Sequence, residues 1–402
     1  MKSHERLAEM APDMVAELAT WRRHLHQHPE LAYEEHATAD FVADKLCDWG
    51  IEVHRGLAGT GVVGTLRRGE GPAIAVRADM DALPIREVNS FAHASATPGK
   101  MHACGHDGHT AMLLGAARHL AQHGTFCGTV HFIFQPAEEG QAGARRMMDE
   151  GLFSRFPAQR VFAMHNYPGM PVGTLAVRPG PIMACVDTWE IHITGRGAHA
   201  AMPQTGIDPV VASAQIILGL QTIVSRNLEP VDSGVISVTQ SAAGDSFNVI
   251  PQNVVLRGTA RSFRPATRDL IERRMAEVTS GIAAATGCEA VLDYQRSYPP
   301  TINSPAEAHF AADVAAALVG EDRVLRDVEP VMGGEDFAFM LEEMPGAYLF
   351  IGNGSNADGR ILHSPHYDFN DEALPVGAQF WVRLVEAALC EDGERYFAGA
   401  AA

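Results

Sequence analysis

The stretch Met101-His102-Ala103-Cys104-Gly105-His106-Asp107-Gly108-His109-Thr110 places one thiol, one carboxylate and three imidazoles directly before a helical pattern. Divalent transition metals select these ligand types, and the two glycines let a backbone curl around an ion. The pattern predicts a metal site. Two alternatives stay open on these residues alone: a histidine-rich surface loop, or a cysteine nucleophile with a neighbouring base.

The composition is that of a soluble protein large enough for two domains. Of 402 residues, 46% are hydrophobic and 20% are charged, and the formal net charge is -18. That charge argues against nucleic acid or an anionic membrane as a partner, since either would need a basic face. No uninterrupted apolar run reaches membrane-spanning length.

Two further features predict a cytoplasmic location. The charged segment Met1 to Arg6 runs into an amphipathic helix pattern and has no apolar core of the length found in signal peptides. The six cysteines lie far apart, without the spacing of a disulfide framework, which suits a reducing compartment. We therefore expect a protein of the cytoplasm.

Helices and short strands alternate on both sides of the central stretch. Two helical patterns lie between Ala11 and Gly50, and the second ends at Gly50. The predicted strands are residues 51–53, 61–66, 73–77, 129–134 and 161–164, and residues 113–122 continue the central stretch as a helix. Polar residues at the ends of such strands are candidates for a functional site.

Candidate ligands stand where three of these strands end. Asp79 and Asp81 follow the third strand, Glu138 and Glu139 follow the fourth, and His165 follows the fifth. Of two adjacent carboxylates at a strand exit, one can bind a metal while the other stays free as a base. Each residue also has a simpler interpretation on its own, as part of an acidic turn or as a structural histidine.

After Pro181 the predicted elements follow the order strand, helix, strand, strand, helix, strand. The strands are residues 187–194, 234–240, 254–263 and 289–294, and the helices are residues 208–226 and 267–286. This βαββαβ order is the ferredoxin-like arrangement, a compact unit in its own right. We therefore predict an inserted domain at residues 185–296, with residues 1–184 and 297–402 forming the domain that it interrupts.

Two loops near the carboxyl end add further candidates. Gly333 and Gly334 stand with two acidic residues at the start of a helical pattern, where backbone N–H groups could hold an anion such as a substrate carboxylate. A plain helix start is the alternative. His363 and His366 lie in a loop that could supply a last metal ligand from far along the chain.

Taken together, seven motifs resemble the metal-dependent aminoacylase, hippurate hydrolase and indole-acetyl-amino-acid hydrolase branch of the dinuclear metallopeptidases. The wider family includes glutamate carboxypeptidase and succinyl-diaminopimelate desuccinylase. The resemblance covers nearly the whole chain. It implies an α/β catalytic domain, with a central mixed sheet flanked by helices, and an inserted ferredoxin-like lid and dimerisation domain. The motifs are His28–Leu31, Arg77–Pro84, Cys104–His109, Gln135–Gly140, Gly197–Pro203, Gly333–Phe337 and His363–His366.

The resemblance implies that five residues bind two divalent ions, with the Cys104 thiolate bridging them and Glu138 acting as general base. The wider family usually has an aspartate where Cys104 stands, and a thiolate favours softer ions. The implied metals are manganese or zinc, with cobalt or nickel as alternatives. Asp81, Asp107 and His109 would support the ligands from behind or have ordinary structural roles. The implied ligands are Cys104, His106, Glu139, His165 and His363.

The resemblance also assigns roles within the inserted domain. A histidine matching His199 reaches the substrate carbonyl, from the partner subunit of a homodimer. Asn248 and Arg261 would hold the substrate carboxylate, for which the paired donors of a guanidinium are suited. The implied reaction is hydrolysis of the amide bond of a small N-acyl amino acid by metal-activated water, giving a carboxylic acid and a free amino acid.

Three rival interpretations remain open for the sequence alone. A cysteine hydrolase would use Cys104 and His106, and alkylation rather than chelation would inactivate it. A dipeptidase or carboxypeptidase of the same superfamily would prefer peptides to N-acyl amino acids. A non-catalytic protein that binds metal or amino acids would show no hydrolysis, although the intact Glu138 argues against it.

Overall fold

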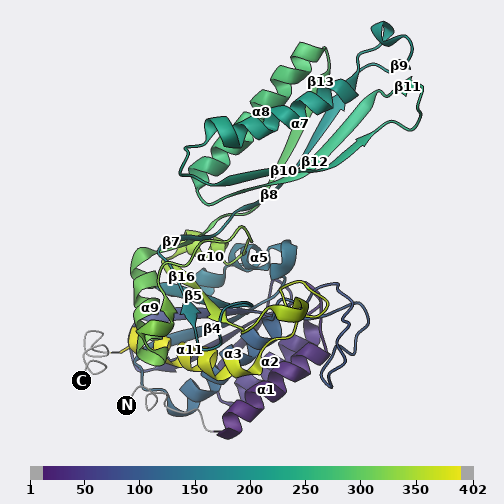
Figure 1. The fold of residues 1–402 in the computed structure, drawn as a ribbon. Coiled ribbons are helices and arrows are strands. Elements are labelled where there is room, and N and C mark those ends of the chain that lie inside the picture. Colours follow the sequence, from purple (N-terminus) through teal and green to yellow (C-terminus); the bar gives the residue numbers. More distant parts are fainter. Residues whose placement is uncertain (1–11, 391–402) are drawn as a thin grey trace. The chain divides into compact units, whose positions relative to one another are not determined.

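The computed structural model describes residues 12–390, which form two compact units (Figure 1). The second unit includes the whole predicted insertion, residues 185–296, with a few residues beyond each end and one separate segment. The domain limits inferred from the sequence stay predictions. The features predicted at Met1 to Arg6 and at Ala11, and the outer ends of the predicted domains, lie outside the described residues. The first unit contains residues 12–180, 302–329 and 339–390, and the second contains residues 181–301 and 330–338.

A mixed sheet of eight described strands, in the order β1-β2-β4-β3-β5-β16-β6-β15, forms the centre of the first unit. The neighbours β4, β3, β5 and β16 run parallel, whereas β2 and β6 pair antiparallel with β4 and β16. The carboxyl ends of the four parallel strands therefore meet at one edge, where α/β sheets commonly bind ligands. The strands are β1 (Glu52–Leu57), β2 (Gly61–Arg68), β3 (Ala73–Asp79), β4 (Gly128–Gln135), β5 (Arg160–Tyr167), β6 (Leu175–Ala176), β15 (Val324–Leu325) and β16 (Gly346–Gly352).

Helices flank this sheet, so the predicted α/β architecture is confirmed. Helix α3 packs against β3 and against two neighbouring helices, α1 and α11, while α9 packs against β16 and α11. The α-helices are α1 (Pro12–Gln27), α2 (His36–Asp48), α3 (His106–His123), α4 (Glu138–Gln141), α5 (Gly143–Asp149), α6 (Leu152–Arg155), α9 (Pro305–Val319), α10 (Ala338–Glu343) and α11 (Leu374–Ala388). Short 3-10 turns are η2 (Glu321–Arg323), η3 (Ala357–Gly359) and η4 (Asp371–Ala373).

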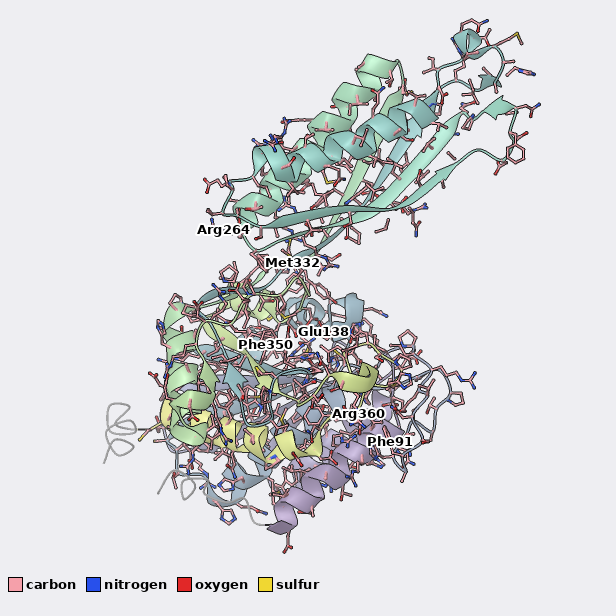
Figure 2. The ribbon with its side chains drawn as sticks, in the orientation of Figure 1. Phe91, Glu138, Arg264, Met332, Phe350 and Arg360 are labelled. Carbon is pink, nitrogen blue, oxygen red and sulfur yellow. The ribbon has the colours of Figure 1, made fainter. Side chains whose placement is uncertain are left out.

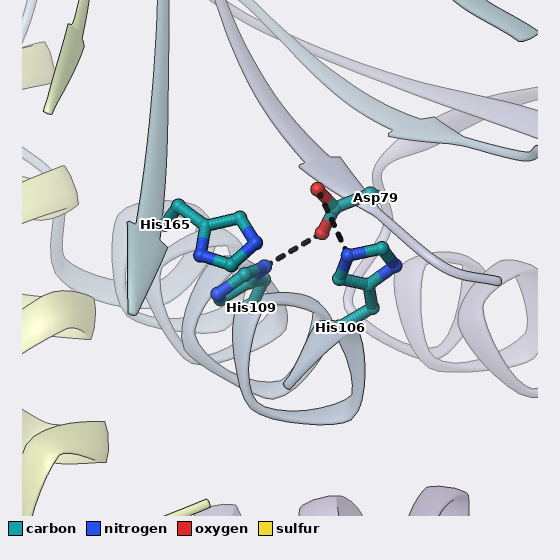
Figure 3. Close-up of side chains that lie close together, drawn as sticks. All are labelled: Asp79, His106, His109 and His165. Carbon is teal, nitrogen blue, oxygen red and sulfur yellow. Dashed lines mark hydrogen bonds and ion pairs between the residues drawn. The ribbon is translucent and has the colours of Figure 1, made fainter. Parts of the chain in front are cut away.

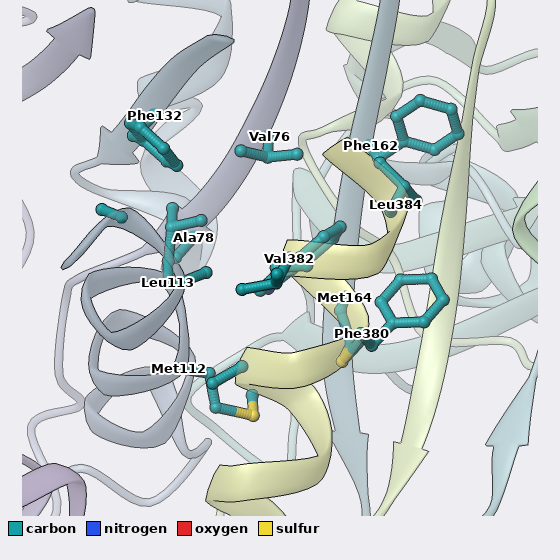
Figure 4. Close-up of a cluster of buried hydrophobic side chains, with 14 of the residues drawn as sticks. Val76, Ala78, Met112, Leu113, Phe132, Phe162, Met164, Phe380, Val382 and Leu384 are labelled. Carbon is teal, nitrogen blue, oxygen red and sulfur yellow. The ribbon is translucent and has the colours of Figure 1, made fainter. Parts of the chain in front are cut away.

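The hydrophobic core of the first unit lies between the sheet, α3 and α11 (Figure 4). Val76 and Phe132 from the sheet belong to one buried cluster with Met112 of α3 and Phe380 of α11. Gly377 lets α11 approach α3 closely, because a Cβ at this position would lie 2.0 Å from the sulfur of Met112. This packing fixes α3, whose first turn carries two histidines of the central stretch.

The second unit is a four-stranded antiparallel sheet, in the order β10-β12-β8-β13, with two helices packed on it. The first and third strands of the βαββαβ order lie at the centre, so the predicted ferredoxin-like fold is confirmed. Alternate residues of β12 are buried, as expected when one face of a sheet is covered. Its elements are β8 (Val186–Thr194), α7 (Pro209–Asn227), β10 (Gly234–Ala243), β12 (Asn253–Ser262), α8 (Pro265–Thr286) and β13 (Glu289–Tyr298).

Two small strand pairs and one helix start differ from the sequence-based expectation. Strands of two to four residues are too short to show a periodic pattern, so neither pair was predicted. Helix α3 begins at His106 rather than at residue 113, because Gly105 adopts φ 93 as its N-cap and the polar first turn is buried by tertiary packing. The additional elements are β7 (Gly180–Met183) with β14 (Thr301–Asn303), β9 (Ala198–His199) with β11 (Val249–Ile250), and η1 (Pro203–Thr205).

Among residues 12–390, no helix combines the length and the apolar character that crossing a membrane would require.

Candidate metal centre

The structure brings the five predicted ligands together, although they come from four separate segments. Cys104 and His106 lie at the start of α3, Glu139 lies on α4 after β4, His165 lies near the end of β5, and His363 lies in the loop after β16. Strands β4 and β5 both belong to the parallel part of the sheet. The candidate centre therefore sits at the carboxyl edge of that sheet.

The innermost group consists of Cys104, His106 and Glu139, whose donor atoms all lie within 4.8 Å of one another. His106 is fully buried; its Nδ1 lies 3.2 Å from Asp81 Oδ1, but its Nε2 makes no hydrogen bond to any described residue. This nitrogen lies 3.7 Å from Asp79 Oδ2, too far for a hydrogen bond. A buried nitrogen without a hydrogen bond costs free energy that a bound cation would recover. The residues present therefore fit a metal ion.

The charge around His106 also favours a cation. Burial lowers the pKa of this histidine, but the carboxylates of Asp79, Asp81 and Glu139 outweigh burial and raise the pKa to about 10. Several buried carboxylates thus surround a single imidazole. A divalent ion would supply the positive charge that this cluster favours while leaving the imidazole neutral as a ligand.

Each of the two remaining predicted ligands contacts one member of the innermost group. His165 Nε2 lies 3.3 Å from Cys104 Sγ, and His363 Nε2 lies 3.2 Å from Glu139 Oε1. The backbone N–H of His363 donates to the carbonyl of Ala103 at 2.8 Å, which holds this distant loop beside Cys104. The five side chains therefore form one group.

The surroundings of Cys104 disfavour the cysteine-nucleophile alternative. Burial raises the pKa of its thiol well above the usual value, and the carboxylates of Glu139 and Glu138 raise it further. Burial also holds the pKa of the adjacent His165 well below its usual value. An activated cysteine needs a lowered thiol pKa beside a basic imidazole, and here both shifts run the other way. A bound cation would favour the thiolate form of Cys104.

Asp81 is placed to orient two of the predicted ligands. One carboxylate oxygen pairs with Nδ1 of His106, and the other accepts the backbone N–H of Glu139 at 2.9 Å. A carboxylate behind a ligating histidine fixes the tautomer and the direction of the ring. The contacts of Asp81 are compatible with the supporting role that the resemblance implies, and that role stays a prediction.

His109 uses both ring nitrogens for contacts within the protein (Figure 3). Its Nδ1 lies 2.6 Å from Asp79 Oδ1, and its Nε2 accepts the backbone N–H of Asn166 at 2.9 Å. Asp79, a candidate at the end of its strand that is not among the five implied ligands, also accepts from Arg77 at 2.8 Å. His109 and Asp79 are therefore hydrogen-bonded within the protein, although donor atoms of Asp79, His106, His109 and His165 lie within 4.8 Å of one another.

Asp107 belongs to a second buried cluster behind the first turn of α3. Its Oδ2 lies 2.8 Å from His26 Nδ1 and 3.9 Å from Arg22 Nη1, and His26 Nε2 lies 3.2 Å from Glu87 Oε1. Burial lowers the pKa of His26, but its two carboxylate partners raise that pKa to about 9. Asp107 thus ties α3 to α1.

Asn166 and Tyr367 hold the backbone of the central stretch, and neither was predicted as a site residue. Asn166 Nδ2 donates to the carbonyl of Cys104 at 2.6 Å, and Tyr367 donates its hydroxyl proton to Asn166 Oδ1 at 2.8 Å. A Cβ on Gly105 would lie 2.3 Å from Asn166 Nδ2, which explains the glycine. The available signal was that Asn166 directly follows a predicted ligand.

Glu138, the predicted general base, is buried at the start of α4 (Figure 2). The preceding Ala137 has φ 56 and the following Gly140 has φ 78, so the chain turns sharply on both sides of the two carboxylates. Such a turn gives adjacent carboxylates different surroundings. A division between a metal ligand at Glu139 and a base at Glu138 requires this difference.

In the second unit, His199 ends β9, and Asn248 directly precedes β11, the strand that pairs with β9. His199 stands opposite Val249, and the N–H of Ala200 donates to the carbonyl of Asn248 at 3.0 Å. The ring Nδ1 of His199 accepts the backbone N–H of Ala201 at 3.1 Å, so a neutral His199 carries its proton on Nε2. Both side chains are exposed.

The half-buried Arg261 stands on β12, opposite Val235 of β10. Burial lowers the pKa of its guanidinium. The nearby carboxylate of Asp187 is bonded to Arg268 and Tyr294 instead, and no carboxylate among residues 12–390 forms an ion pair with Arg261. Its positive charge is therefore available to an anionic ligand.

Gly333 and Gly334 lie in a segment without regular secondary structure before α10, not at the first turn of the helix. A Cβ on Gly334 would lie 2.0 Å from Cγ2 of Val186, and a Cβ on Gly333 would lie 3.1 Å from Cε of Met183. Close packing within the second unit thus accounts for the glycine at position 334.

A buried group of thiol, imidazole and carboxylate donors at the carboxyl edge of an α/β sheet is typical of a metal-dependent hydrolase. Comparison with known proteins identifies the family. The chain belongs to peptidase family M20/M25/M40, whose family model matches residues 75–387.

Three known proteins illustrate the relationship. The IAA-amino acid hydrolase ILR1-like 5 of Arabidopsis thaliana is 40% identical over 377 residues, covering 92% of this chain and 86% of the relative. The N-acetylcysteine deacetylase of Bacillus subtilis is 41% identical over 375 residues, covering 92% and 97%. A solved structure from Bacillus subtilis, a dinuclear metal-binding peptidase of the M20 family, is 37% identical with a TM-score of 0.83, covering 94% and 99%.

These comparisons confirm the resemblance drawn from the seven motifs and the expectation of a hydrolase. The chain is a member of a metallohydrolase family that includes dinuclear metal-binding proteins, and it carries a group of residues suited to hold metal.

Proposed function

We propose that the chain hydrolyses the amide bond of small N-acyl amino acids with the help of two bound divalent ions. The observation that carries the proposal is the convergence of the five candidate ligands beside the buried Glu138. The names of the two sequence relatives support the substrate class, because one refers to IAA-amino acids and the other to N-acetylcysteine.

In this proposal Cys104, His106, Glu139, His165 and His363 would hold the two ions. Bound ions lower the pKa of a water molecule and polarise a carbonyl group. Manganese and zinc are the first candidates, with cobalt and nickel next. The thiolate favours the softer ions of this set, whereas the carboxylate and imidazoles accept all of them.

Glu138 acts as the general base. Its carboxylate takes a proton from the attacking water and later passes that proton to the leaving nitrogen, so that a carboxylic acid and a free amino acid are released. Burial supports this role, because a carboxylate shielded from bulk water does not exchange its proton freely with solvent during the reaction.

Residues of the second unit position the substrate. The Nε2–H of His199 donates to the carbonyl oxygen, where negative charge develops in the transition state. Arg261, whose charge has no internal partner among the described residues, binds the substrate carboxylate together with Asn248. The backbone at Gly333 and Gly334 also contacts the substrate.

We further propose that the protein works in the cytoplasm as a homodimer or as an oligomer built from dimers, with the second unit as lid and dimerisation domain and His199 supplied by the partner subunit. No nucleic acid or membrane takes part. The net charge of -18 supports this, since both of those partners favour basic surfaces.

A hydrolysis panel tests the proposed function. Metal-reconstituted protein is assayed with N-acetyl, N-benzoyl and indole-acetyl amino acids, and with dipeptides for comparison. We expect N-acyl amino acids to be cleaved faster than dipeptides, with activity lost on chelation and restored by added manganese or zinc. A blank panel would contradict the proposal, and activity that survives chelation but not alkylation would favour a cysteine hydrolase.

A further inference from the structure

Two buried carboxylates hold the backbone on either side of Glu138. The N–H of Ala137 donates to Glu35 Oε1 at 2.9 Å, and the N–H of Glu139 donates to Asp81 Oδ2, also at 2.9 Å. Glu138 lies between these two anchored peptide groups. Asp81 already has a place in the candidate centre, whereas Glu35 lies far earlier in the chain than Glu138 and had no assigned role.

Glu35 is placed to serve this turn and not its own helix. It is the N-cap residue of α2, but its side chain makes no capping hydrogen bond there. Another residue performs that task, since the carboxylate of Glu30 accepts the N–H groups of Ala37 and Thr38 at 3.0 and 2.8 Å. The carboxylate of Glu35 is instead directed to the loop after β4.

The surroundings of Glu35 fix the direction of its carboxylate, and burying this group costs folding free energy. Its side chain is fully buried, and Oε2 accepts the hydroxyl proton of Thr60 at 2.6 Å. No described residue forms an ion pair with it, and burial raises its pKa to about 6. A buried carboxylate held only by neutral donors is expensive for a fold, so a specific task would explain it.

The same segment also holds the far end of the turn. The hydroxyl of Tyr33 donates to the carbonyl of Gln141 at 2.7 Å, and Tyr33 itself has φ 64. Leu31 forms a bridge to Ala82, the residue after Asp81. Residues 31–35 therefore contact the turn at Ala137 and at Gln141. Leu31 also pairs with the neighbour of Asp81, whose carboxylate holds the N–H of Glu139 in the middle of the turn.

We infer that Glu35 is a positioning residue that sets the direction of the Glu138 carboxylate by holding the Ala137 peptide group. The turn needs this anchor because Ala137 and Ala142 adopt φ 56 and φ 54, a conformation that residues with a Cβ rarely take. The inference rests on the proposed function, in which Glu138 is the base.

Two substitutions at Glu35 test the inference. Glu35→Ala removes the acceptor, and misplacement of a catalytic group by about 1 Å can cost about 100-fold in rate. We expect kcat for the best substrate of the panel to fall about 10- to 100-fold, with KM and metal content unchanged. Glu35→Gln keeps an oxygen for Ala137 and an amide donor for the Thr60 hydroxyl, so it should retain most of kcat.

A double-mutant cycle with Glu138→Gln decides whether Glu35 acts through Glu138. Adding Glu35→Ala to Glu138→Gln should cause no further loss of kcat. Equal losses in both backgrounds would overturn the inference, as would a normal kcat in Glu35→Ala or equal impairment in Glu35→Ala and Glu35→Gln. If Glu138→Gln alone kept full activity, the base assignment itself would fail, which is a distinguishable result.

Two further variants control for folding. Glu30→Ala removes a carboxylate that makes the same kind of backbone contact but only caps α2, so kcat should stay normal even if the melting temperature falls. Should Glu35→Ala not fold, Thr60→Val removes only the hydroxyl that holds Oε2. It should lower kcat less than Glu35→Ala is expected to, again without effect in the Glu138→Gln background; a normal kcat in Thr60→Val would then count against the inference.

Discussion

The candidate ligands of the first unit and the candidate substrate contacts of the second unit differ in how the protein holds them. His106 is buried and oriented by Asp81, and the peptide groups around Cys104 are held by Asn166 and His363. His199 and Asn248, in contrast, lie exposed at a strand pair outside the four-stranded sheet. The first arrangement is fixed by buried contacts, as preorganised chemistry would require, whereas the second leaves its side chains exposed to solvent.

Because of this contrast, substitutions in the two regions should affect different properties of the protein. Changes in the first unit should lower metal content or turnover, because they disturb groups that are already fixed. Changes in the second unit should act mainly on substrate affinity and should leave metal content and folding intact.

The largest effect on turnover is expected for Glu138→Gln. The substitution keeps the shape of the side chain but removes the base, so kcat should fall about 100- to 10,000-fold. Metal content per subunit, measured on the purified protein, should not change. Glu342→Gln on α10 serves as the exposed control. Near-normal turnover in a metal-loaded Glu138→Gln protein would show that another group acts as base.

Within the first unit, a comparison of His106→Ala with His109→Gln should separate ligands from supporting residues. Loss of His106 removes a donor whose Nε2 makes no hydrogen bond to any described residue, so the protein should retain less than its full complement of metal after dialysis. His109→Gln should lower metal affinity only about 10- to 100-fold. Metal titration of both apo-proteins measures their metal affinities. Equal affinities would contradict the assignment of His106 as a ligand and of His109 as a supporting residue.

For the second unit, Arg261→Lys should raise KM without changing metal content. The loss of paired donors to the substrate carboxylate should cost about 10-fold in KM. A substrate with a carboxamide in place of the carboxylate should bind both proteins equally poorly. Arg257→Lys on the same strand, whose partner is Glu190, is the matched control. An unchanged KM in Arg261→Lys would remove this residue from the substrate site.

The smallest effect on turnover is expected from the buried cluster behind the centre, which should affect stability instead. The pKa of His26 is raised to about 9 in the folded protein, so its protonated form stabilises the fold. That contribution is fully present below about pH 6.5, the unfolded value, and is lost as pH rises through about 9; its size is about 3 kcal/mol at most.

The melting temperature of the wild type should therefore fall between pH 7 and pH 9.5 more than that of His26→Gln. The buried Asp187 of the second unit provides the contrast, because Arg268 keeps its charge throughout this range. Parallel melting curves for wild type and His26→Gln would show that His26 is not a charged partner of Asp107.

Much of the architecture could be predicted because it follows from local patterns. The alternation of apolar residues and the order of elements after Pro181 predicted the ferredoxin-like unit, and its strand order confirms that prediction. Two-residue strands such as β9 are too short to show an alternating pattern of apolar residues. The early start of α3 depends on the burial of polar side chains. Neither could be predicted without knowledge of the tertiary packing.

The chain by itself determined the chemistry that is available: a cysteine, histidines and acidic pairs in the order of a metallohydrolase family, at strand ends where a parallel sheet gathers them. The tertiary structure alone decided which of these groups meet. Hydrogen bonds join His109 to Asp79, Asp107 to His26 in a separate cluster, and Glu35 to the turn of Glu138. The physical reason is that a role depends on which atoms a side chain meets, and contacts between residues a hundred positions apart leave no local pattern in a sequence.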